Sequence, residues 1–186
     1  MSKNKHIMID LETMSTASNA AIISIGAVLF SEVEGIKAKF NRVISLKSST
    51  EYGLVIEAAT IKWWMQQSDE AREIFKANGY ELPRALVDFT KWLDQIDCYP
   101  SATVLWGNGS DFDNVILTSA YKACNLPQPW MFYNNRCYRT VKQIGIKQGI
   151  LIPSNGIKHN ALDDACNQAL HLIEISKANP SLGLLD

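Results

Sequence analysis

The first fifty residues contain three stretches whose hydrophobic pattern predicts β-strands. Residues 7–12 begin as an apolar run, and residues 20–30 form a longer run in which nearly every side chain is apolar. Runs of this kind fit strands that are covered on both faces of a sheet. Residues 36–46, which follow the turn at Glu34 and Gly35, alternate between apolar and polar side chains. Because short links join the three stretches, they predict an antiparallel meander.

Helical periodicity dominates the rest of the chain, with one further strand pattern. Residues 102–106 form a short β-type run that ends at a Gly-Asn-Gly turn. Ser110 or Asp111 can cap the helix that follows, whereas residues 128–138 predict irregular structure. Apolar residues at helical spacing predict helical segments over 58–75, 86–93, 110–124, 140–148 and 160–177. The whole pattern predicts one α/β domain over residues 1–186, with a mixed sheet flanked by helices.

Composition and charge exclude some classes of protein. The chain has 186 residues, of which 47% are hydrophobic, and a formal net charge of −1. This balance excludes a strongly basic coat for nucleic acid, but it allows an enzyme that holds a few phosphates. No apolar stretch approaches the roughly 18–20 residues of a membrane-spanning helix. The basic start at residues 1–6 leads into a run that Asp10 and Glu12 interrupt, which does not fit a secretory signal. A cytoplasmic location is therefore expected.

The four cysteines show no paired spacing. Cys98, Cys124, Cys137 and Cys166 are scattered, and no two of them form a C-x-x-C motif. We expect them to be reduced and structural, because a zinc cluster requires closer ligand pairs.

Asp10 and Glu12, which close the first apolar run, are the most informative polar residues of the chain. In a β-strand, residues i and i+2 project from the same face, so these two carboxylates would lie side by side. Like charges this close repel, and burial raises their pKa values unless a cation compensates. The pair therefore favours a divalent metal at the end of this strand.

Further acidic residues begin two of the predicted helices. Asp113 lies in the first turn of the helix after the Gly-Asn-Gly turn, and Asp163 and Asp164 lie in the first turn of the last helix, shortly after His159. Taken singly, each carboxylate fits an ordinary helix start, which the helix dipole favours. A single histidine between a loop and a helix is equally consistent with an exposed linker residue. The residues alone leave both interpretations open.

Three segments in this order resemble a known family. Residues 10–13 (Asp-Leu-Glu-Thr), 108–114 (Asn-Gly-Ser-Asp-Phe-Asp-Asn) and 159–165 (His-Asn-Ala-Leu-Asp-Asp-Ala) resemble the three motifs of the DEDDh 3′–5′ exonucleases. The sequence that flanks these motifs, including the adjacent pair Trp63 and Trp64, resembles that of phage exonuclease A and related small bacterial exonucleases, a branch of this family. The first motif alone is weak, but the three motifs together are a specific signal.

The resemblance implies a ribonuclease H-like fold, two divalent metals and a set of site residues. Two metals, Mg²⁺ or Mn²⁺, would be held by four carboxylates, and His159 would be the general base. In the third motif the histidine and the metal-binding aspartate stand five residues apart, which selects Asp164 rather than Asp163. Asp163 and Asp111 are interpreted as helix-start residues instead. The carboxylates implied as metal ligands are Asp10, Glu12, Asp113 and Asp164.

The resemblance also implies contacts with a nucleic-acid substrate, for which single-stranded 3′ ends of DNA or RNA are expected. The candidate substrate-binding residues are Thr13, Met14, Trp64, Asn108 and Asn114. All except Thr13 have a structural alternative: a buried methionine, a core tryptophan, or an asparagine that serves a turn or a helix start. One tryptophan of the pair is expected in the core and the other against a base, since adjacent residues do not share a helix face. A homodimer is compatible with the resemblance.

The function that the resemblance implies is a metal-dependent 3′–5′ exonuclease that releases nucleoside 5′-monophosphates. An alternative from another class is a catalytically idle nucleic-acid-binding or scaffold module with the same fold. A third is a phosphoesterase that acts on very short oligonucleotides or nucleotide derivatives. The sequence does not indicate whether DNA or RNA is preferred, and it does not indicate the biological pathway.

Overall fold

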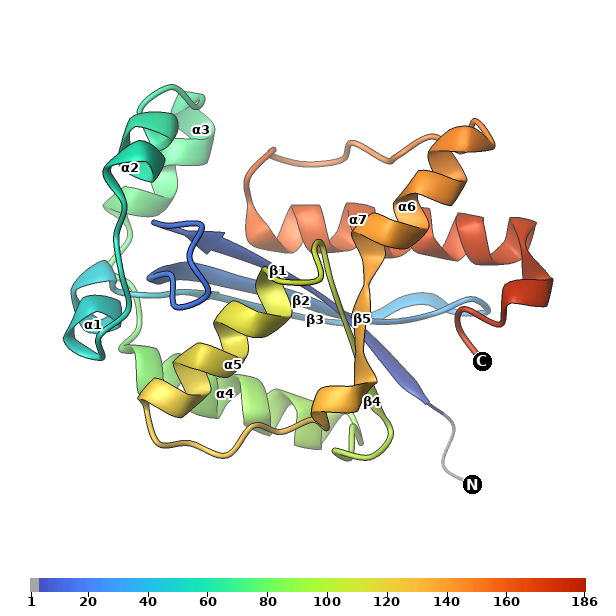
Figure 1. Ribbon diagram of the computed structural model, residues 1–186, viewed down its shortest axis with the longest axis horizontal. Coiled ribbons are helices and arrows are strands. Elements are labelled where there is room, and N and C mark those ends of the chain that lie inside the picture. The colour runs from blue at the N-terminus through green and yellow to red at the C-terminus, as the bar shows by residue number, and fades with distance from the viewer. Residues whose placement is uncertain (1–3) are drawn as a thin grey trace.

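A five-stranded mixed sheet forms the centre of the protein (Figure 1). The computed structural model describes residues 4–186, and the strand order across the sheet is β3-β2-β1-β4-β5. β1 pairs antiparallel with β2, and β2 with β3, whereas β4 is parallel to β1 and β5 is parallel to β4. The strands are β1 (Lys5–Thr13), β2 (Ile22–Ser31), β3 (Gly35–Val43), β4 (Thr103–Gly107) and β5 (Asn135–Cys137). This confirms the predicted α/β class and its antiparallel first three strands.

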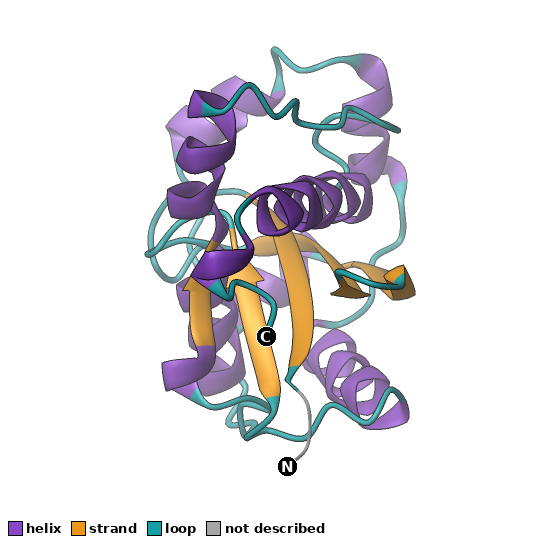
Figure 2. Cartoon of the chain, turned by 90° about the vertical axis from the view of Figure 1, so that its right-hand side faces the viewer, coloured by secondary structure: helices purple, strands orange, loops and turns teal. Residues whose placement is uncertain are grey.

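Helices cover both faces of this sheet. α4 and α5 lie on one face, and α6 and α7 lie on the other (Figure 1); Figure 2 views the molecule at right angles to this. The helices are α1 (Leu46–Glu51), α2 (Ala58–Trp64), α3 (Asp69–Arg72), α4 (Leu82–Gln95), α5 (Asp113–Ala123), α6 (Tyr138–Lys147) and α7 (Ala161–Ala178). Short 3₁₀ turns are η1 (Glu73–Lys76), η2 (Phe132–Asn134) and η3 (Pro180–Leu182).

The central strand β1 divides its side chains between two hydrophobic cores. Ile7, Ile9 and Leu11 belong to the larger core, which includes the buried residues of α4 and α5. Met8 belongs to the second core, together with buried residues of α6 and α7. Since successive residues of a strand face opposite ways, Asp10 continues the Met8 face. The first carboxylate is therefore directed toward the α7 side of the sheet.

Three local predictions need correction. α5 begins at Asp113 with Phe112 at its N-cap position and no side-chain cap, so neither Ser110 nor Asp111 caps it. Residues 128–138 are not wholly irregular, because β5 adds a strand there; its three residues lack the alternation that would have predicted it. α1, which Ser45 caps, lies partly in a segment predicted as strand.

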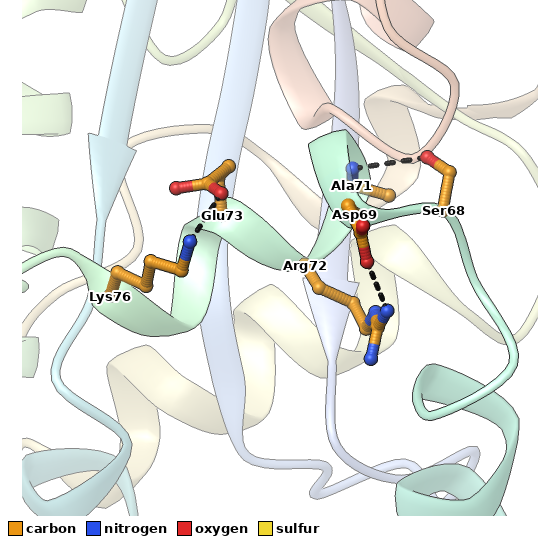
Figure 3. A network of polar contacts seen from close by, with 6 residues as sticks. All are labelled: Ser68, Asp69, Ala71, Arg72, Glu73 and Lys76. Atoms are coloured by element: carbon orange, nitrogen blue, oxygen red, sulfur yellow. Dashed lines mark hydrogen bonds and ion pairs between the residues drawn. The ribbon is translucent and has the colours of Figure 1, made fainter.

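The segment between α2 and α4 carries a small surface network (Figure 3). The Ser68 hydroxyl accepts a hydrogen bond from the backbone N–H of Ala71 at the start of α3. Arg72 pairs with Asp69, and Lys76 pairs with Glu73, each three residues apart. Exposed ion pairs of this kind contribute roughly 0–1 kcal/mol. Ala71 is buried in the larger core and packs this segment against it.

The cysteines, the helix lengths and the basic start of the chain were also subjects of prediction. Cys98 is buried and the other three cysteines are half-buried, and all four are free thiols. Within residues 4–186, every helix is too short or too polar to cross a membrane. The first three residues of the predicted basic start lie outside the described residues.

Candidate active site

The end of β1 presents two buried carboxylates on one face. Asp10 and Glu12 are 9% and 6% exposed, and they pair with Gly26 and Ser24 across the β1–β2 ladder. An irregularity in this ladder follows at once, between Glu12 and Thr13. Such irregularities end regular pairing and redirect the chain, and they are frequent beside active sites. The predicted side-by-side placement of the two carboxylates is thus present.

Asp113 joins the site from the first position of α5. Parallel pairing between β1 and β4 ends at Met8. Beyond that point, the Asp113 carboxylate accepts one hydrogen bond from the Leu11 backbone N–H at 3.0 Å and another from the Asn108 N–H at 2.7 Å. Asp113 is 1% exposed. It therefore fastens the start of α5 to the end of β1, close to Asp10 and Glu12.

The start of α7 brings in His159 and Asp164. The Asn160 side chain caps the helix by accepting from the backbone N–H groups of Leu162 and Asp163. His159 has a positive φ of 63°, and its backbone N–H donates to the Asp164 carboxylate at 3.0 Å. This turn directs the His159 and Asp164 side chains toward β1.

Asp163 has a different set of contacts from its neighbour. Its carboxylate accepts from the Ile157 backbone N–H at 2.8 Å and so stabilises the loop before α7. Its backbone N–H is one of the two that the Asn160 side chain caps. These contacts agree with the structural role that was predicted for Asp163.

The end of β1 and the start of α7 lie close enough to share a cation. One ligand atom from each of Glu12, His159 and Asp164 lies within 4.8 Å of the other two. The charges of Asp113, Glu12 and Asp164 each act on Asp10. Carboxylate oxygen is the ligand type that Mg²⁺ and Mn²⁺ prefer. The donor set therefore fits a divalent metal.

Burial and mutual repulsion make these carboxylates hard to ionise without a cation. Desolvation, followed by the charges of Asp164 and Asp113, raises the pKa of Glu12 to about 8. Desolvation, followed by the charges of Asp113, Glu12 and Asp164, raises the pKa of Asp10 well above its usual range. The pKa of Asp113 rises only to about 6, because backbone N–H groups offset part of the desolvation. A cation bound between these carboxylates would favour their ionised forms and lower their pKa values again.

His159 lies against an aromatic wall. Its ring is 4.8 Å from the Trp63 ring and 6.3 Å from the Trp64 ring, both edge to face. Desolvation lowers the pKa of His159 from its usual value, although the charge of Asp164 opposes the shift. A half-buried imidazole with a lowered pKa is largely neutral at physiological pH and can accept a proton.

A cavity of about 900 Å³ opens over these residues. Its wall includes Asp10, Glu12, His159 and Asp164, together with two of the predicted substrate-binding residues, Thr13 and Asn108. The Thr13 hydroxyl donates to the Ser15 carbonyl. The other three predicted contacts, Met14, Trp64 and Asn114, are absent from the lining.

The two tryptophans of the pair divide between core and cavity, but Trp64, the candidate substrate contact, is the core residue. Trp64 is 2% exposed, and its indole N–H donates to the Thr13 carbonyl, which makes it a core residue that supports the end of β1. Trp63 is 40% exposed and lines the cavity beside His159. Adjacent helical residues point in different directions, and the sequence did not indicate which of the two faced the site.

Met14 and Asn114 also take the structural alternatives. Met14 is 5% exposed and belongs to the larger core. The Asn114 amide donates to the Leu105 carbonyl and to the Asn135 side chain, which ties α5 to β4 and β5. Neither residue reaches the cavity, because each faces the sheet rather than the strand ends.

Other residues of the cavity wall were not predicted. Gln168 on α7 donates to the Asp10 carboxylate at 2.7 Å. Arg139 and Lys142 on α6, with Lys158 before α7, place basic side chains around the cavity. Gln168 stands four residues after Asp164, which is one helical turn, and this spacing was the available signal.

The fold and the carboxylate cluster agree with the resemblance of the three motifs to the DEDDh 3′–5′ exonucleases. The chain belongs to the 3′–5′ exoribonuclease Rv2179c-like domain family, whose sequence profile matches residues 5–176. An exodeoxyribonuclease of Enterobacteria phage T4 is 27% identical over 120 residues, which are 59% of this chain and 52% of the relative. The chain thus spans about half the length of this curated relative.

Solved structures share the fold. The nuclease domain of 3′hExo, a DEDDh family member bound to rAMP, superposes with a TM-score of 0.65 at 15% identity and covers 98% of this chain and 94% of its own. Exonuclease I of E. coli, in complex with a 5cy-dT13 oligonucleotide, has a TM-score of 0.65 at 16% identity over 97% of this chain and 42% of its own. At these identities the likeness extends to the fold alone.

Proposed function

We propose that this protein is a metal-dependent 3′–5′ exonuclease that hydrolyses the terminal phosphodiester bond of a nucleic acid and releases a nucleoside 5′-monophosphate. The observation that carries the proposal is the convergence of Glu12, His159 and Asp164 within 4.8 Å. Asp10 and Asp113 belong to the same cluster, because the charge of Asp113 acts on Asp10 and on Glu12. The family and the fold of the chain support the same activity.

Two divalent cations, Mg²⁺ or Mn²⁺, would be held by the carboxylates of Asp10, Glu12 and Asp164, with support from Asp113. Both oxygens of Asp113 already accept a backbone N–H, which favours support through water rather than a bare ligand. When bound, a metal pair polarises the phosphate and stabilises both the attacking and the leaving oxygen. A bound cation would relieve the repulsion among the carboxylates that contributes to the raised pKa values of Glu12 and Asp10.

His159 acts as the general base. A water molecule attacks the phosphorus, and the neutral imidazole takes one proton from it as the bond between phosphorus and the 3′ oxygen breaks. The positive φ of His159 and its backbone bond to Asp164 fix the ring beside the carboxylates. A histidine near neutral pH is suited to this role, which contributes about 10²–10⁴-fold.

The cavity wall supplies contacts for a single strand. The half-exposed Trp63 ring offers a stacking surface, and base stacking is worth roughly 1–3 kcal/mol. Arg139 and Lys142 line the α6 side of the cavity, where they can approach phosphates of the strand. Thr13 and Asn108 lie close to the carboxylates and can contact the terminal nucleotide. An unpaired 3′ end is therefore the proposed substrate.

The test is digestion of a 5′-labelled single strand and its duplex, each as DNA and as RNA, with Mg²⁺ or Mn²⁺. A shortening ladder with release of nucleoside 5′-monophosphates is expected from the single strand. Both polymers are needed, because the family is described as exoribonuclease and the phage relative as exodeoxyribonuclease. Binding without cleavage in either metal would identify an idle binding module. Cleavage of dinucleotides but not of long strands would identify an oligonucleotide phosphoesterase.

A further inference from the structure

Gln168 on α7 contacts Asp10 at the wall of the cavity. It follows Asp164 by four residues, so the two side chains lie on the same face of the helix, one turn apart. The Gln168 side chain is 7% exposed, and it lines the cavity next to Asp10. Its Nε2 donates to Asp10 Oδ1 at 2.7 Å, a distance typical of a hydrogen bond to a charged acceptor.

The other amide atom of Gln168 has no partner. Within residues 4–186, Oε1 is buried and accepts no hydrogen bond. A buried acceptor without a partner is destabilising, so a donor is expected at this point when the cation is bound. The nearby side chains of Asp10, Glu12 and Asp164 are themselves acceptors when ionised, and none of them can supply that donor.

A hydrated cation at Asp10 would account both for the hydrogen bond from Nε2 to Asp10 and for Oε1, which lacks a donor among residues 4–186. Mg²⁺ and Mn²⁺ keep several of their waters when they bind to proteins, and those waters donate hydrogen bonds outward. The amide can serve such a water with Oε1 while Nε2 fixes the carboxylate that holds the cation. With the cation bound, Asp10 is ionised, and it then sets the orientation of the amide because an ionised carboxylate accepts hydrogen bonds only.

We propose that Gln168 is a positioning residue of the metal site: Nε2 holds the Asp10 carboxylate, and Oε1 accepts a hydrogen bond from a hydration water of the cation. The inference rests on the proposed function, from which it takes the cation. It adds a residue outside the four carboxylates and the histidine.

The adjacent residue provides a matched control. Asn167 is 8% exposed and also lines the cavity, but its amide is engaged with the backbone of Asn155, to which it donates at 2.9 Å and from which it accepts at 3.1 Å. Asn167→Leu removes a buried amide from the same turn of α7 without touching Asp10. A merely structural effect would appear in both variants.

The experiment measures Mn²⁺ binding to the full chain by calorimetry, without nucleic acid. Gln168→Met keeps the length of the side chain and removes both polar atoms. We expect its Mn²⁺ affinity to fall about 10–100-fold, the usual effect of losing an outer-shell partner, and its activity to recover at high Mn²⁺ concentration. Asn167→Leu is expected to lower the melting temperature while binding Mn²⁺ as the wild type does.

The outcomes separate this inference from the proposed function. One outcome is that Gln168→Met folds and binds Mn²⁺ with an affinity within about twofold of the wild type, a negligible difference in binding free energy. In that case the proposed role of Gln168 is wrong, even if the wild type is an active nuclease. If Gln168→Met fails to fold, Gln168→Asn, whose amide is too short to reach Asp10, replaces it with the same expected loss. A wild type that binds no Mn²⁺ overturns both proposals.

Discussion

Gly26 on β2 lies directly against Ala161, the first residue of α7. A Cβ atom at position 26 would lie 2.2 Å from the carbonyl carbon and oxygen of Ala161. Gly26 is also the partner of Asp10 across the β1–β2 ladder. The missing side chain thus lets the start of α7 approach the sheet at the level of the first carboxylate, which sets how closely Asp164 approaches Asp10.

We therefore expect Gly26→Ala to displace the start of α7 and separate the carboxylates. Overpacking of this kind costs about 1–3 kcal/mol of stability, and a misplacement of about 1 Å reduces turnover about 10²-fold. Urea denaturation and exonuclease assays measure the two effects. In Gly149→Ala, where the added Cβ has open space and φ is +73°, only backbone strain is expected and turnover should persist. Normal turnover in Gly26→Ala would contradict the role of this contact.

Neutralising a single carboxylate should abolish turnover while the fold remains. Asp10→Asn and Asp164→Asn each remove a charge from the proposed cation site but preserve the shape of the side chain. Because removing a buried repulsive charge relieves like-charge strain, the metal-free variants should be at least as stable as the wild type. Asp111→Asn, at an exposed position close in sequence to Asp113, is the control and should retain full activity. An active Asp10→Asn protein would overturn the metal assignment.

Loss of the base should slow hydrolysis without preventing metal binding. We expect His159→Ala to reduce kcat by about 10²–10⁴-fold and to lose the acidic limb of the pH–rate profile. Mn²⁺ calorimetry on the same variant should give an affinity close to that of the wild type. A profile that keeps its acidic limb in His159→Ala would assign the proton transfer to another group.

The two adjacent tryptophans should respond differently to substitution. Trp63→Ala removes the exposed ring beside His159, so KM for a single strand should rise by a factor that corresponds to roughly 1–3 kcal/mol of stacking. Trp64→Ala removes a buried ring and its hydrogen bond to Thr13, so the free energy of unfolding should fall by about 3–5 kcal/mol. Thermal melting and KM measurements on both variants test the assignment. The reverse pattern would restore Trp64 as the substrate contact.

The stability of the metal-free protein should fall as the pH rises. In the folded protein the pKa of Glu12 is about 8 and that of Asp113 about 6, compared with ordinary values of 4.5 and 3.8. Folded molecules therefore hold more protons than unfolded ones between these limits, and the free energy of unfolding decreases by up to about 1.4 kcal/mol per pH unit for each extra proton. Urea denaturation in a chelator at about pH 5 and about pH 8 checks this. Glu12→Gln should flatten the trend, and stability that increases with pH would contradict it.

The sequence by itself determined the features that depend on local periodicity. Alternation along β1 placed Asp10 and Glu12 on one face, and the spacing from Asn160 separated the loop-bound Asp163 from Asp164. The order of the three motifs was sufficient to indicate the family. These properties hold because neighbours along a strand or a helix have fixed relative directions whatever the rest of the chain does.

Only the tertiary structure decided which side chains face the cavity. Trp63 rather than Trp64 lines it, because α2 packs Trp64 beneath the end of β1. Gln168 reaches Asp10 across 158 positions of the chain, and Gly26 is needed because α7 crosses β2 at that residue. The strand β5 exists through its parallel pairing with β4 and not through its own pattern. Such contacts depend on how distant elements pack, and a periodicity read along one segment carries no information about its distant partner.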